Sequence, residues 1–164
     1  MAEPLRLLVV CLGNICRSPL AEGVLRQRLA EAGLEHRVEL DSAGTGSWHI
    51  GQPPDPRTIA NAARHGVDLT LLRARQLHAA DYHRFDWLLC ADRSNLADVH
   101  ARAPAGATAR SALLLDWAGL GQGVEVPDPY TGGAEAFERV WTLVDRAAHA
   151  IVARLADRTA RIDA

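Results

Sequence analysis

The stretch Leu5–Gly23, LRLLVVCLGNICRSPLAEG, decides the fold of this chain. Its first six residues form a nearly continuous apolar run, which is typical of a β-strand buried on both faces. Apolar residues then recur at helical spacing, with Ser18 suited to the N-cap and Pro19 to the first helical position. The stretch therefore predicts a strand, a loop over 11–17 and a helix that ends near Gly33.

The rest of the chain alternates strands and helices. Val38–Gly44 and Phe85–Ala91 predict two further buried strands, and Ser111–Leu115 predicts a weaker fourth. Pro56–His65 predicts a helix, and apolar residues line one face of a long final helix over Phe137–Leu155. This alternation predicts an α/β fold, in which helices cover both faces of a parallel sheet and the cleft lies at the carboxyl ends of the strands.

Length and composition limit the class of protein. The 164 residues, 48% of them hydrophobic, predict one globular domain over 1–164. A net charge of −2 argues against nucleic acid as the main partner, and no apolar stretch is long enough to predict a membrane span. The start, MAEPLRLLVV, lacks the features of a signal peptide, so we expect a cytoplasmic protein. Three cysteines are too few for a disulfide scaffold, which indicates reduced thiols.

The loop after the first strand carries a nucleophile and a phosphate-binding cation. Cys11 and Arg17 bracket five residues, and a loop of this kind before a helix can aim backbone N–H groups at an anion. The planar fork of Arg17 can bind two phosphate oxygens. In the same positive field, Cys11 is predicted to be a thiolate placed beneath a bound phosphorus atom. Taken alone, a cysteine at a strand end is more often a packing residue.

A second segment, VPDPYTGG over Val126–Gly133, offers a proton donor. A thiolate phosphatase needs an acid for its leaving group, and Asp128 lies in a Pro-flanked turn before the final helix. Tyr130 could form an aromatic wall on the same loop. On spacing alone, a plain Asp-Pro turn is the simpler explanation of this segment.

Three segments together carry a resemblance to a known family. CLGNICRSP, DSAGTGSWHIGQPPDPR and DPYTGG resemble the low-molecular-weight protein tyrosine phosphatases, and the similarity runs from about Leu5 to Leu155. The resemblance implies a four-stranded parallel sheet with helices on both faces, a flavodoxin-like three-layer sandwich. It also implies hydrolysis of phosphotyrosine in a protein or peptide, with inorganic phosphate as product and with neither a cofactor nor a metal.

The resemblance also implies roles for individual residues. Cys11 attacks phosphorus to form a cysteinyl-phosphate, Arg17 and the loop N–H groups hold the phosphate oxygens, and Asp128 acts first as acid and then as base. Ser18 donates its proton to Cys11, and Asn14 pins the loop together with Ser42. The phosphate-binding loop and its support comprise Leu12, Gly13, Asn14, Ile15, Cys16, Ser18 and Ser42. The apolar walls of the substrate slot are Leu12, Ile15, Trp48 and Tyr130.

Two positions need a closer comparison with relatives of that family. Leu72 lies where they often carry a histidine that joins the Asn14–Ser42 network, which puts the bracing of the loop in doubt. Ile15 lies where relatives that act on phosphoarginine tend to have threonine, so it favours an aromatic phosphoester. A further segment that resembles the family, with Asp92, Ser94 and Asn95, is interpreted as structural support.

Cys16 raises a separate question, since it lies in the same short loop as Cys11. The curl of the loop predicts that Cys16 captures an oxidised Cys11 as a reversible disulfide that blocks the phosphate site. The alternative is that Cys16 only packs beneath the loop.

Two other functions stay open at this stage. An arsenate reductase on the same scaffold would need resolving cysteines in a flexible segment, and besides the loop cysteines only Cys90 is available, inside a predicted strand. A non-catalytic phosphate-binding module could keep Arg17 but would not need both Cys11 and Asp128. The seven histidines show no ligand spacing with the cysteines, so we expect no zinc site.

Overall fold

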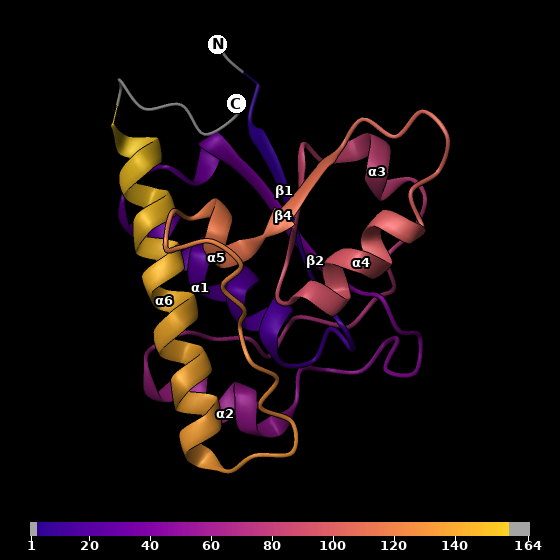
Figure 1. Ribbon diagram of the computed structural model, residues 1–164. Coiled ribbons are helices and arrows are strands. Elements are labelled where there is room, and N and C mark those ends of the chain that lie inside the picture. The colour runs from indigo at the N-terminus through magenta and orange to yellow at the C-terminus, as the bar shows by residue number, and fades with distance from the viewer. Residues whose placement is uncertain (1–2, 158–164) are drawn as a thin grey trace.

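The computed structural model describes residues 3–157, and its centre is a four-stranded parallel sheet (Figure 1). The strands are β1 (Leu5–Cys11), β2 (Val38–Gly44), β3 (Trp87–Cys90) and β4 (Arg110–Leu113), in the spatial order β2-β1-β3-β4. The first strand, β1, pairs with both β2 and β3, and Leu7 to Val10 are buried, which confirms the expected strand buried on both faces.

Helices cover both faces of the sheet, as expected. They are α1 (Arg17–Glu31), the 3₁₀ turn η1 (Glu35–Arg37), α2 (Pro56–Arg64), α3 (Asp81–Arg84), α4 (Arg93–Ala101), α5 (Leu114–Trp117) and α6 (Ala134–Ala156). In Figure 1, α1, α5 and α6 lie on one side of the sheet and α3 and α4 on the other.

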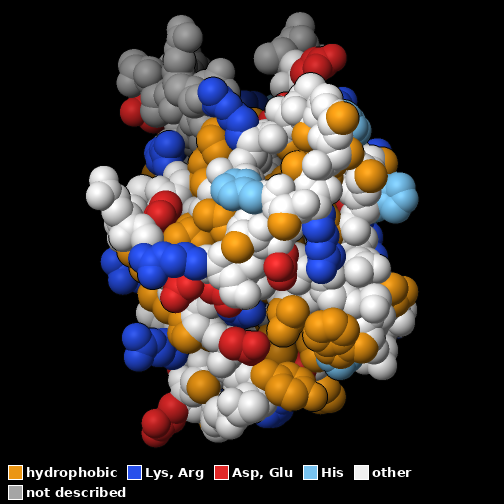
Figure 2. Space-filling view, turned by 45° about the vertical axis from the view of Figure 1, so that its right-hand side comes forward, with side chains coloured by type: hydrophobic (Ala, Val, Ile, Leu, Met, Phe, Trp, Pro, Cys, Tyr) orange, Lys and Arg blue, Asp and Glu red, His pale blue; other side chains and the backbone are white. Residues whose placement is uncertain are grey.

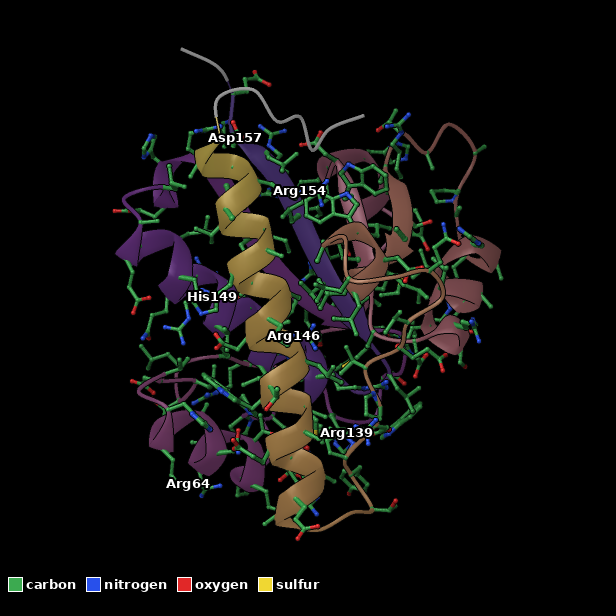
Figure 3. All side chains as sticks on the ribbon, turned by 60° about the vertical axis from the view of Figure 1, so that its left-hand side comes forward. Arg64, Arg139, Arg146, His149, Arg154 and Asp157 are labelled. Carbon is green, nitrogen blue, oxygen red and sulfur yellow. The ribbon has the colours of Figure 1, made fainter. Side chains whose placement is uncertain are left out.

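Alternating side chains of β1 separate the two halves of the core. Leu7 and Val9 pack into the cluster beneath α1, α5 and α6, whereas Leu8 and Val10 pack into the cluster beneath α3 and α4. Because successive side chains of a strand point to opposite faces, the continuous apolar run of β1 serves both layers. The outer side of α6 is polar and carries the exposed residues Arg139, Arg146 and His149 (Figure 3).

Local sequence signals account for the ends of several helices. Asp55 is the N-cap of α2, where its carboxylate accepts the backbone N–H of Arg57 at 2.9 Å, and Pro56 occupies the first helical position. Gly33 follows α1 with a φ of 71°, in the left-handed region that glycine adopts without strain. Within residues 3–157, no helix is long and apolar enough to cross a membrane.

The structure corrects three of the expected boundaries. The third strand is shorter than 85–91, and the fourth ends at Leu113 because the next residues form α5. Leu114 and Leu115 are buried there, and an apolar pattern cannot distinguish a strand from a buried helical turn. Ser18 is not the N-cap of α1, because the helix already begins at Arg17 and the Ser18 hydroxyl has other partners inside the protein.

Candidate active site

The loop between β1 and α1 is fastened to the segment that follows β2. Cys11 is the last residue of β1 and only 3% of its surface is exposed. The carbonyl groups of Cys11 and Leu12 accept the backbone N–H groups of Thr45 and Gly46, at 2.9 and 2.8 Å. This close approach depends on Gly44, because a Cβ atom there would lie 2.8 Å from the Leu12 carbonyl oxygen. The loop is therefore held through its carbonyl groups at the carboxyl edge of the sheet.

Asn14 holds the strained part of this loop. Its φ of 57° lies in the left-handed region, which asparagine tolerates better than most residues. The Nδ2 group donates hydrogen bonds to the hydroxyls of Ser18 and Ser42, at 2.7 and 3.0 Å, and Oδ1 accepts the backbone N–H of Arg75 at 3.0 Å. The contact expected between Asn14 and Ser42 is therefore present.

A buried acid that the sequence analysis did not single out continues this network. Glu22 is 4% exposed and accepts the Ser42 hydroxyl at 2.7 Å. Glu22 and the backbone of Arg75 brace the loop without a histidine at position 72, where Leu72 instead packs against the core. The sequence signal that could have identified Glu22 is an acid one helical turn after Ser18, on a side of α1 that is otherwise buried.

The Cys11 sulfur has a hydrogen-bond partner in Ser18. The distance from Sγ to the Ser18 Oγ is 3.0 Å, and Ser18 is fully buried. Because Ser18 Oγ already accepts a hydrogen bond from Asn14, its own O–H is available to donate to the sulfur. This arrangement would stabilise a negative charge on Cys11.

The Arg17 guanidinium is buried and held along one edge. Its Nη1 group donates to Asp92 Oδ2 at 2.7 Å and to the Val126 carbonyl oxygen at 2.9 Å, and Arg17 is 4% exposed. Asp92 also forms a capping box with Asn95 at the start of α4, which agrees with the structural role expected for both residues. The contact of Asp92 with Arg17 was missed, although an acid directly after a buried strand points to the carboxyl edge of the sheet.

Asp128 faces Arg17 from the loop before α6. Its Oδ2 lies 3.8 Å from Arg17 Nη2, and its Oδ1 accepts the backbone N–H of Tyr130 at 3.1 Å. The Asp128 side chain is about half exposed, whereas the guanidinium beside it is buried. An acid in this position can reach both the pocket and solvent.

Cys11, Arg17 and Asp128 line one small cavity of about 230 Å³. The residues that line it are Cys11, Leu12, Gly13, Ile15, Cys16, Arg17, Trp48, His49, Asp128 and Tyr130. Trp48 and Tyr130 are 62% and 49% exposed, so they form the outer walls. In Figure 2, apolar side chains gather at the lower right of the surface, next to acidic and histidine side chains. His49, which the sequence analysis did not consider, is oriented by Gln52, with Nδ1 2.8 Å from its Oε1.

The other two cysteines are buried and differ from Cys11 in their surroundings. Burial raises the pKa of Cys16 to about 12, and burial also raises the pKa of Cys90 to about 12. Both are therefore neutral thiols at physiological pH. All three cysteines are free. Across residues 3–157, no group of three His, Cys, Asp or Glu side chains is arranged to hold a metal ion.

Comparisons with known proteins point to one family. The family model described as low molecular weight phosphotyrosine protein phosphatase matches residues 6–161. The low molecular weight phosphotyrosine protein phosphatase of Schizosaccharomyces pombe is 43% identical over 84% of this chain and 88% of its own length. The low molecular weight protein-tyrosine-phosphatase of Streptomyces coelicolor is 42% identical over 93% of this chain and 94% of its own. The crystal structure of YfkJ from Bacillus subtilis superposes with a TM-score of 0.84 at 36% identity, covering 93% of this chain and 94% of that one.

Proposed function

The chain belongs to the low molecular weight phosphotyrosine protein phosphatase family and is a protein tyrosine phosphatase, and we propose that Cys11, Arg17 and Asp128 carry out its reaction. The observation that carries this proposal is the placement of a buried thiol, a buried guanidinium and a half-exposed carboxyl group around one cavity with apolar walls. The reaction proceeds in two steps through a cysteinyl-phosphate.

In the first step, the Cys11 thiolate attacks phosphorus. The S–P bond forms as the bond from phosphorus to the phenolic oxygen breaks, and protonated Asp128 gives its proton to that oxygen. The Nη2 side of the Arg17 guanidinium, which faces the cavity and Asp128, and the loop N–H groups hold the equatorial oxygens. Because Asp92 and Val126 fix the other edge of the guanidinium, little reorganisation is needed when charge shifts.

In the second step, water releases the phosphate. Asp128, now a carboxylate, takes a proton from water as the water oxygen attacks phosphorus and the S–P bond breaks. The electron pair returns to Cys11, where the Ser18 hydroxyl at 3.0 Å stabilises the departing thiolate. Inorganic phosphate leaves, and Asp128 is again protonated for the next cycle.

The walls of the cavity support phosphotyrosine in a protein or peptide as the substrate. A flat phenyl ring buries well between Trp48 and Tyr130, and Ile15 adds an apolar surface. An arsenate reductase does not fit, because Cys90 is fully buried in β3 and cannot serve as a mobile resolving thiol. A non-catalytic phosphate-binding module would not need both a thiol at Cys11 and a carboxyl group at Asp128.

The presence of Cys16 in the same loop as Cys11 supports a reversible protection of Cys11 against oxidation. Peroxide converts the Cys11 thiolate to a sulfenic acid with release of hydroxide, and Cys16 then attacks that sulfur, forming the S–S bond and releasing water. Since the pKa of Cys16 is about 12, Cys16 stays protonated and is not itself the first target of peroxide. Three free thiols also fit the reducing cytoplasm, where we place the protein.

Substitution of the loop residues tests the proposed function. Cys11→Ser should abolish turnover of 4-nitrophenyl phosphate and still bind inorganic phosphate, measured by calorimetry. Arg17→Ala should lose both binding and turnover, because the guanidinium touches the phosphate itself. A Cys11→Ser protein with more than trace activity would contradict the mechanism.

A further inference from the structure

Arg57, in the first turn of α2, lies beside the loop that carries Asp128. Its guanidinium carbon is 5.4 Å from the centre of the Tyr130 ring and 4.6 Å from that of Phe137, both within the range of a cation–π contact. Phe137 is buried in the first helical turn of α6, whereas Tyr130 is half exposed. Arg57 thus connects the half-exposed Tyr130 of the acid loop to Phe137, which is buried in the core.

Asp55 holds the Arg57 side chain in this position. The carboxylate accepts Nε at 3.0 Å and Nη2 at 2.9 Å, and these side-chain hydrogen bonds keep the pKa of Asp55 below its usual value. Asp55 itself is anchored, because its backbone N–H donates to the Ile15 carbonyl oxygen at 2.8 Å. The same pair of residues therefore touches both the phosphate-binding loop and the acid loop.

The contact with Tyr130 reaches the catalytic acid through one further bond. The Tyr130 backbone N–H donates to Asp128 Oδ1 at 3.1 Å, so the position of Tyr130 sets the direction of the carboxyl group. A general acid must lie within hydrogen-bond distance of the oxygen that it protonates. A shift of Tyr130 would therefore weaken proton donation and leave the attack by Cys11 intact.

We infer that Arg57 is a positioning residue that acts through Tyr130 to hold Asp128 beside the leaving-group oxygen. This inference rests on the proposed function, in which Asp128 is the acid. It predicts an effect that depends on the leaving group, because a poor leaving group such as the phenol of tyrosine needs the proton and an acidic phenol does not. A role of Arg57 in folding alone would affect all substrates equally.

The test compares kcat/KM for phosphotyrosine and for 4-nitrophenyl phosphate. Arg57→Met, which keeps the length of the side chain but removes the cation, should lower kcat/KM for phosphotyrosine roughly 3- to 10-fold, the scale of a lost cation–π contact. The value for 4-nitrophenyl phosphate should change less than about twofold, and competitive inhibition by inorganic phosphate should be unchanged. Arg57→Lys should recover most of the loss, because it restores a cation beside Tyr130.

Arg64→Met is the matched control. Arg64, labelled in Figure 3, is the last residue of the same helix, is exposed and is not among the residues that line the cavity. The Arg64→Met substitution also removes one positive charge from α2, but kcat/KM for phosphotyrosine and for 4-nitrophenyl phosphate should both stay at the parent level. Thermal unfolding of both variants would show whether the fold of either is changed.

A double-mutant cycle with Asp128→Asn separates this inference from the proposed function. If Arg57 acts through Asp128, Arg57→Met should have no further effect on phosphotyrosine once the acid is gone. An equal additional loss in the Asp128→Asn background, or equal losses on both substrates, would overturn the positioning role. If Asp128→Asn itself shows no dependence on the leaving group, the proposed acid is wrong. If Asp128→Asn shows it and Arg57→Met does not, only the inference about Arg57 fails.

Discussion

Asn14 should determine both the stability of the phosphate-binding loop and its activity. Replacement by Ala removes three hydrogen bonds, to Ser18, Ser42 and the backbone of Arg75, all from a residue that is 2% exposed. At about 1 kcal/mol each, their loss costs roughly 3 kcal/mol. The φ of 57° adds a second cost, since Ala pays roughly 1–2 kcal/mol in the left-handed region. The free energy of unfolding of Asn14→Ala should therefore fall by about 4–5 kcal/mol.

Two further variants separate the hydrogen bonds from the backbone. Asn14→Gly loses the same three hydrogen bonds without the left-handed penalty. The glycine makes the unfolded chain more flexible, which lowers the free energy of unfolding by roughly 0.5–1 kcal/mol. Asn14→Gly should therefore be less destabilised than Asn14→Ala, by up to about 1.5 kcal/mol. Gly33→Ala isolates the backbone cost, because Gly33 has a φ of 71° and a Cβ there would meet no atom within 4 Å.

Urea unfolding followed by tryptophan fluorescence measures these differences, with kcat/KM for 4-nitrophenyl phosphate measured in parallel. Both Asn14 variants should lose activity because the loop N–H groups are no longer held in place, whereas Gly33→Ala should keep it. A loss of stability below about 1 kcal/mol in Asn14→Ala would refute the reasoning from the network. An Asn14→Gly protein that is less stable than Asn14→Ala would refute the reasoning from the backbone.

Three further predictions concern the acid, the second cysteine and the choice of substrate. Asp128→Ala should lower kcat on phosphotyrosine by roughly 10²–10⁴ and should affect an activated aryl phosphate less; equal losses would mean that Asp128 only shapes its loop. After a pulse of peroxide, thiol should restore the parent enzyme but not Cys16→Ser, and phosphate should protect both. Because its pKa is raised to about 12, Cys16 is rarely a thiolate at neutral pH. The rate at which sulfenic Cys11 and Cys16 form the disulfide should therefore rise roughly tenfold per pH unit between pH 6 and 9. A rate that does not change with pH would exclude Cys16 as the attacking thiol. Phosphotyrosine should be preferred to phosphoserine by kcat/KM, and Ile15→Thr should shift the preference towards phosphoarginine; an enzyme that cleaves phosphoserine equally well would rule out Trp48 and Tyr130 as ring walls.

The sequence by itself determined the elements whose cause is local. The apolar run before Cys11 predicts β1, the change to helical spacing predicts α1, and the loop between them therefore falls at the carboxyl edge of the sheet. The Asp-Pro turn places Asp128 in the loop before α6 for the same reason. These signals lie within a few residues of the structure that they specify, so they can be read without knowing what packs against them.

Only the tertiary structure decided how the site is held. Arg17 is oriented by Asp92 and Val126, which lie 75 and 109 residues further along the chain. Asp92 reaches Arg17 because β1 pairs with β3, and Val126 does so because its backbone N–H donates to the Ala91 carbonyl oxygen at 2.8 Å. Neither contact leaves a periodic trace in the sequence. The same holds for Glu22, which braces Asn14 through Ser42, a residue brought beside it by the packing of α1 on the sheet. Reactive groups can be recognised by their type and spacing, but the partners that fix their geometry come from whichever segments the folded sheet places next to them.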